Sequence, residues 1–146
     1  MIELIALAAA AAAIPTSEKA AIFAAAGARR RGPNWVICTE DRNAVARIDS
    51  FKDINGDGRP EALVSEDGSY CNGAAETGFA LVSKQADGKW KLVLEASGVP
   101  EFLKTKGTGG WPDISVGGPG FCFPVLRWNG RNYANQRREY EGKPCR

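Results

Sequence analysis

The chain has 146 residues, a length that suits one globular domain with its own hydrophobic core. Charged residues make up 25% of it and the formal net charge is +2, which argues against a disordered chain and against a protein that coats nucleic acid. Histidine is absent, so the commonest general base and the commonest metal ligand are both missing.

The chain starts with MIELIALAAAAAAIPTSEK, in which residues 4–14 form an uncharged, alanine-rich run. This run is too short to span a membrane, which needs about 20 residues, but it has the length of the apolar part of an export signal. Residues 11–13 supply the small side chains that a signal peptidase requires. Glu3 and the lack of a preceding Lys or Arg fit this less well, and the alternative is an alanine-rich helix of the mature domain. We expect residues 1–13 to be a signal peptide and residues 14–146 to be a single globular domain.

A helix is expected at residues 16–27, where Thr16 or Ser17 can cap the start and Gly27 can end it. Alternating apolar and polar residues then predict strands at 44–51 and 61–65, and a hairpin around residues 86–88. We expect residues 66–78 to be a long loop, and residues 96–112 to be mostly loop with a helical turn at 100–105. A second hairpin is expected around Asn129-Gly130. Together these elements predict an α+β fold in which an N-terminal helix packs on a mainly antiparallel sheet of about six or seven strands.

The most distinctive motif is FKDINGDGRPEALV at residues 51–64, between two expected strands. Asp53, Asn55, Asp57 and Glu61 offer side-chain oxygens, and the carbonyl of Arg59 can add another, which is the kind of ligand set that calcium prefers. Position 12 of the loop is Val64, where an EF-hand has glutamate, so this is not an EF-hand. The alternative is a sharp turn without an ion, because Asn, Asp and Gly are also the residues that turns prefer.

The same residues resemble the calcium loops of FG-GAP and VCBS-type repeats, which have the pattern Asp-x-Asn/Asp-Gly-Asp-Gly-x-x-Asp before a strand. The resemblance implies Asp53, Asn55, Asp57 and Glu61 as ligands. Those families repeat the motif around a propeller, whereas here it occurs once and ends in Glu rather than Asp. More broadly, the chain resembles small exported bacterial proteins of an uncharacterised family that have one such loop and a C-terminal segment like WPDI…VLRWNGRNY.

Four cysteines are present, Cys38, Cys71, Cys122 and Cys145, and an even number in an exported chain indicates disulfides. Three pairings are possible, and we expect Cys38–Cys145 with Cys71–Cys122.

Two kinds of side chain could contact a partner. Arg29, Arg30 and Arg31 form a basic run that can bind phosphate or an acidic partner, although a solvated surface is the better explanation of it. Trp111 lies in the glycine-rich stretch GTGGWPD, where a core role is less obvious than for Trp90 and Trp128. The partner is expected to be a protein or glycan of the cell envelope, not nucleic acid, and the mature chain is expected to have no membrane span.

No catalytic residue is predicted. Without histidine, acid–base chemistry would need paired carboxylates, and nothing in the spacing of the candidates selects a pair; these are Glu66, Asp67, Glu76, Glu101 and Asp113. The sequence therefore predicts a non-catalytic periplasmic or secreted binding or accessory module, with calcium as its one expected cofactor. The alternative is a small hydrolase that uses carboxylates to act on cell-wall glycans.

Overall fold

The computed structural model describes residues 13–146, so the expected signal peptide lies, apart from its last residue, outside the described part of the chain. Within that part, no helix is both long enough and apolar enough to cross a membrane.

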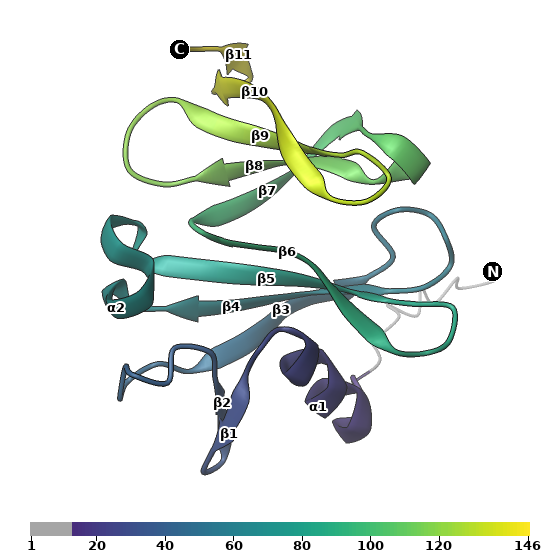
Figure 1. Cartoon of the computed structure of the whole chain (residues 1–146), viewed down its shortest axis with the longest axis vertical. Coiled ribbons are helices and arrows are strands. Elements are labelled where there is room, and N and C mark those ends of the chain that lie inside the picture. Colours follow the sequence, from purple (N-terminus) through teal and green to yellow (C-terminus); the bar gives the residue numbers. More distant parts are fainter. Residues whose placement is uncertain (1–12) are drawn as a thin grey trace, which may run out of the picture.

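The described residues form three antiparallel sheets with two short α-helices (Figure 1). The first helix, α1 (Thr16–Ala25), is followed by a two-stranded sheet of β1 (Arg29–Arg31) and β2 (Asn34–Val36). A four-stranded sheet has the order β3 (Ala46–Lys52), β4 (Glu61–Asp67), β5 (Thr77–Lys84) and β6 (Trp90–Ser97). A short helix, α2 (Ser69–Asn72), and the 3-10 turn η1 (Gly73–Ala75) lie between β4 and β5.

The second half of the chain forms a five-stranded sheet in the order β11-β10-β9-β8-β7. Its strands are β7 (Val99–Lys106), β8 (Pro112–Gly117), β9 (Phe123–Trp128), β10 (Tyr133–Tyr140) and β11 (Lys143–Pro144), and the 3-10 turn η2 (Thr108–Gly110) connects β7 to β8. The predicted α+β class with antiparallel sheets is confirmed. The prediction of one sheet with six or seven strands is wrong, because the described residues form eleven strands that divide among three sheets. Helix α1 begins at Thr16, as predicted, and so does not lie at the very start of the chain; it ends at Ala25 instead of residue 27.

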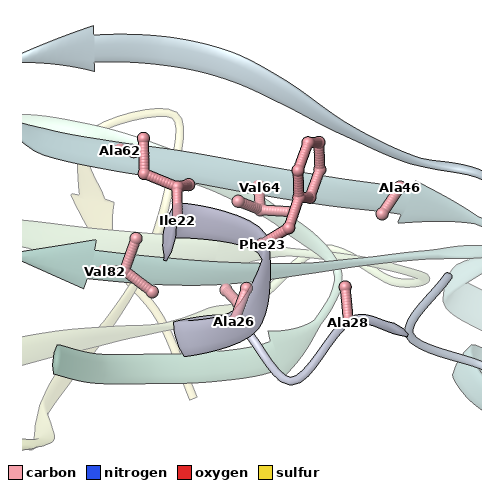
Figure 2. Close-up of a cluster of buried hydrophobic side chains, with 9 residues drawn as sticks. Ile22, Phe23, Ala26, Ala28, Ala46, Ala62, Val64 and Val82 are labelled. Atoms are coloured by element: carbon pink, nitrogen blue, oxygen red, sulfur yellow. The ribbon is translucent and has the colours of Figure 1, made fainter. Parts of the chain in front are cut away.

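Two hydrophobic cores lie on opposite faces of the four-stranded sheet. Ile22 and Phe23 of α1, with Ala26 directly after it, pack on one face, against residues of β3, β4 and β5 that include Val64 and Val82 (Figure 2). On the other face, Phe79 and Leu81 of β5 pack against Trp111, Ile114 and Val116 of the five-stranded sheet. Because its successive side chains enter different cores, β5 is buried along most of its length.

The chain passes from one large sheet to the other at Gly98, between β6 and β7. This residue has φ +122°, and a Cβ there would lie 2.4 Å from the carbonyl oxygen of Gly117 and 2.9 Å from a methyl group of Val116. Only glycine fits such a close approach at this backbone conformation. The residues that follow form β7, so the predicted loop at 96–112 with a helical turn at 100–105 is wrong.

The disulfides join Cys38 to Cys71 and Cys122 to Cys145, and these four are all the cysteines of the chain. Our predicted pairing is therefore wrong. The reason is that Cys38 and Cys71 flank the four-stranded sheet, whereas Cys122 and Cys145 both belong to the five-stranded one. Each disulfide closes a loop within its own half of the molecule.

Candidate functional site

The predicted calcium loop connects β3 to β4 and is folded by side-chain-to-backbone hydrogen bonds. The carboxylate of Asp53 accepts hydrogen bonds from the backbone N–H groups of Asn55 (3.2 Å), Gly56 (2.8 Å) and Gly58 (2.8 Å). These bonds, above all the one from Gly58, lower the pKa of Asp53. Asp57 accepts a bond from the N–H of Arg59 at 2.8 Å, and its other oxygen lies 3.1 Å from the Arg59 guanidinium.

Glu61 differs from the other predicted ligands because its side chain is buried, with 1% of its surface exposed. One carboxylate oxygen accepts the N–H of Ile54 at 2.9 Å, and the other accepts the hydroxyl of Ser83 at 2.8 Å. Burial raises the pKa of Glu61, against the opposing effect of these two bonds. Glu61 thus ties the loop to β5.

The residues of this loop match calcium by their type, and Glu61 fits an ion least well, because its carboxylate is buried and already hydrogen-bonded. Asp53, Asn55 and Asp57 present oxygens in one short exposed loop, as calcium requires. Each Glu61 oxygen already accepts one hydrogen bond and retains one further lone pair. Asp53, Asp57 and Glu61 do not gather within 4.8 Å of one another; among the described residues such a cluster forms only at Cys38, Glu40 and Cys71, where the two sulfurs are joined in a disulfide.

The residues predicted to contact a partner, Trp111 and the arginine run, each contact other parts of the protein itself. Trp111 is 9% exposed and packs against Trp128, with ring centroids 4.9 Å apart. Arg31 donates to the backbone carbonyls of Asp41 and Ala44, and the Arg30 guanidinium lies 5.4 Å from the centre of the Trp35 ring. These residues therefore have evident structural roles, and their contact with a partner stays a prediction.

The loop between β3 and β4 and Trp111, which are far apart in the sequence, meet in the fold. Asn55, Asp57 and Arg59 line a hollow of about 210 Å³ together with Trp111 and Trp128. A Cβ at Gly110, directly before Trp111, would lie 2.8 Å from the backbone carbonyl oxygen of Asn55. The loop thus reaches across to the second large sheet.

Glu66 of β4 is one of the carboxylates that the sequence singled out by type alone. Its side chain is 3% exposed, and its oxygens accept the N–H groups of Ile37 (2.7 Å) and Cys38 (2.8 Å). It lines a hollow of about 270 Å³, together with Glu95 and Asn72. Glu66 therefore fastens the segment after β2 to the four-stranded sheet.

Asp113 of β8 is the centre of a hydrogen-bond network whose importance the sequence did not reveal. Its side chain is fully buried. Arg127 donates to both carboxylate oxygens, from Nε at 3.0 Å and from Nη2 at 2.9 Å, and Arg137 donates from Nη1 at 3.0 Å. Thr105 donates its hydroxyl to the same carboxylate, so one side chain connects β7, β8, β9 and β10.

The remaining carboxylates that the sequence singled out are not assembled into a pair. Asp67 is exposed and forms an ion pair with Arg47, and Glu76 and Glu101 are also exposed. No buried side-chain nitrogen or oxygen lacks a hydrogen-bond partner in the part of the chain that the structure describes. The buried carboxylates are thus all engaged in holding segments together.

One sequence signal could have pointed to the network around Asp113. Residues 123–146 contain six basic and two acidic residues, whereas the whole chain is nearly balanced. Arg127 also lies between Leu126 and Trp128, which identifies it as the residue on the opposite face of that strand. Which acidic residue it would meet depends on strand pairing and could not be read from the sequence.

Comparison with known proteins gives no relative: no family model, curated protein or solved structure matches this chain.

We expect Asp113→Asn to lower the free energy of unfolding by about 3 kcal/mol, because it removes the buried charge that Arg127 and Arg137 contact. Burial alone raises the pKa of Asp113, but hydrogen bonds from Arg127, Thr105 and Arg137 outweigh it and lower the pKa below its usual value. An aspartate in the unfolded chain has a pKa of about 4. Because the pKa of Asp113 is lower in the folded protein, this stabilisation is fully present above about pH 4 and is lost as the pH falls further.

Urea unfolding between pH 7 and pH 2 measures both effects. The free energy of unfolding should fall less steeply with acidification in Asp113→Asn than in the unsubstituted protein. Glu101→Gln, which makes the same charge change at an exposed position of neighbouring β7, serves as the control and should stay within about 0.5 kcal/mol. Equal losses in the two variants would show that Asp113 has no special structural role.

Proposed function

We propose that this chain is a non-catalytic binding or accessory module that works in the periplasm or outside the cell, where it binds a protein or glycan of the cell envelope. The observation that carries the proposal is the use made of the buried carboxylates. Glu61, Glu66 and Asp113 each accept a hydrogen bond from a segment remote in the sequence, and such bonds hold parts of the fold together rather than a substrate. A carboxylate that acts as general acid or base must instead face a reacting group.

The location outside the cytosol is supported by the two disulfides. All four cysteines are paired, and structural disulfides persist in oxidising compartments. The apolar run at residues 4–14 supports the same location, since its length suits an export signal.

Affinity capture of envelope components by the immobilised, disulfide-intact protein tests the proposal. We expect one ligand whose capture saturates and is prevented when an excess of the same protein is added in solution. Reduced and alkylated protein should lose this binding, which controls for nonspecific adsorption.

The competing hydrolase hypothesis rests on the hollow lined by Glu66 and Glu95. It is tested by incubating purified cell wall with the same protein and measuring the release of reducing sugars. We expect no release above the buffer blank. Release that is lost in Glu95→Gln, an exposed position whose substitution should leave folding intact, would replace the binding module with an enzyme.

We further propose that calcium stabilises the loop between β3 and β4, as in the FG-GAP and VCBS-type loops that it resembles. Asp53, Asn55, Asp57, the carbonyl of Arg59 and Glu61 would hold the ion, and its charge would relieve the repulsion that the Asp53 and Asp57 carboxylates exert on Glu61. The role is structural, because these residues connect β3 to β4.

Thermal unfolding in the presence of calcium and of a chelator measures this effect. We expect the midpoint to rise with calcium concentration, since an ion that binds only the folded state stabilises it. Asp53→Ala should abolish the rise, whereas Asp87→Ala, in the turn between β5 and β6, should keep it. If calcium leaves the midpoint unchanged, the loop does not bind the ion and is a hydrogen-bonded turn only.

A further inference from the structure

Two hollows in the five-stranded sheet share the residues Asn135 and Gln136 of β10. One, of about 390 Å³, lies toward η2 and the β9–β10 turn and is also lined by Lys106, Arg127 and Trp128. The other, of about 510 Å³, lies toward β11 and is also lined by Arg137, Arg138 and Arg146. Both volumes fall in the range of ligand sites. A single elongated ligand that passes over Asn135 and Gln136 would enter both.

The charged residues that line these two hollows are all basic. Five basic residues line the two hollows, and their lining includes no acidic residue. Within the described chain, Lys106, Arg138 and Arg146 take part in no ion pair. We call this surface the basic edge; it comprises Lys106, Arg127, Asn135, Gln136, Arg137, Arg138 and Arg146.

Two of the arginines are held in fixed orientations. Arg127 and Arg137 both donate to the buried carboxylate of Asp113, and Arg137 also donates to Glu139. About a third of each arginine side chain nevertheless remains exposed, 35% for Arg127 and 28% for Arg137. Because they are already ordered, these side chains lose little conformational freedom when a ligand binds.

The basic edge lies where β10 lacks a second strand neighbour. β10 pairs with β9 from Tyr133 to Glu139, but it pairs with β11 only through Glu139 and Tyr140. An open strand edge could in principle accept a strand from another protein. However, the pairing of β10 with β9 shifts between Asn135 and Arg137, which is a β-bulge, and bulges and charged side chains are features that prevent strand addition. The side chains rather than the backbone are therefore the recognition elements here.

These side chains suit a sugar that carries acidic groups. Guanidinium groups bind carboxylates through paired N–H donors, and amides can donate to and accept from hydroxyl groups. The side chains of Asn135 and Gln136 are exposed and form no hydrogen bond with the described protein, so both are free to do so. A peptide rich in acidic residues would use the arginines alone.

From this combination of residues we infer that the basic edge binds an acidic oligosaccharide, a sugar chain bearing carboxylate groups. The inference rests on the proposed function, since it names the class of glycan and the surface that binds it. The ligand lies along β10, with carboxylates near the two groups of basic residues and hydroxyl groups near Asn135 and Gln136.

Titration calorimetry with penta-galacturonate tests the inference, with maltopentaose as the uncharged control and penta-glutamate as the control for charge without sugar. We expect binding of penta-galacturonate only, weakening as salt screens the charges. The backbone NMR signals of Asn135 and Gln136 should shift on binding.

A matched pair of double variants locates the site. Lys106→Gln with Arg138→Gln should weaken binding at least about tenfold, since each substitution removes a charge-assisted contact. Lys52→Gln with Lys89→Gln makes the same charge change at exposed positions of the other large sheet and next to β6, and should leave affinity within about twofold. Thermal unfolding confirms that both variants remain folded.

Three results would overturn the inference: no binding of penta-galacturonate, equal weakening in the two double variants, or equally tight binding of penta-glutamate. Its failure is distinguishable from failure of the proposed function. If the Lys106/Arg138 variant still retains an envelope ligand identified in the capture experiment, the binding module stands and the basic edge is not its site. If the unsubstituted protein captures nothing and binds no sugar, both proposals fail.

Discussion

A buried carboxylate is costly unless hydrogen-bond donors surround it, and this constraint determines how the separate parts of the molecule are joined. Glu66 holds the segment after β2 against the four-stranded sheet, and Glu61 holds the loop between β3 and β4 against β5. Asp113 holds the four longer strands of the second large sheet together. In each case a carboxylate on a central strand reaches groups that hydrophobic packing alone would leave loosely placed. The disulfides then close each half of the molecule separately.

This arrangement links the stabilising network to the proposed recognition surface. The carboxylates that might have performed chemistry are engaged with backbone amides, hydroxyls and guanidinium groups, which supports a binding role rather than a catalytic one. The arginines that neutralise Asp113 keep part of their surface exposed, and the basic residues around them remain free of ion pairs. The stabilising network and the proposed sugar site therefore share Arg127 and Arg137, so that the fold itself supplies a rigid cationic surface.

The sequence predicted local structure well and long-range pairing poorly. Helix α1 and the hairpins at residues 86–88 and Asn129-Gly130 were correct, because such local elements are encoded by a few adjacent residues. The expected cap at Thr16 or Ser17 was wrong, since Pro15 is the N-cap and no side chain caps the helix. In β6, strict alternation would put Leu92 and Leu94 on one face, but a bulge between them sends these two side chains to opposite faces. Of the site, the turn chemistry of the Asp53 loop could be read directly. The partners of Asp113 and of the cysteines could not, because they depend on how strands far apart in the sequence come together.

Hydrogen exchange at the backbone amides of Ile37, Cys38 and Ile54 tests the central claim most directly. None of the three is paired in a strand, yet each donates to a carboxylate, Glu66 for the first two and Glu61 for the third. The account predicts that these amides exchange as slowly as those inside β4 and β5. Exchange as fast as that of the exposed amides in the turn between β5 and β6 would show that the buried carboxylates do not hold the fold together.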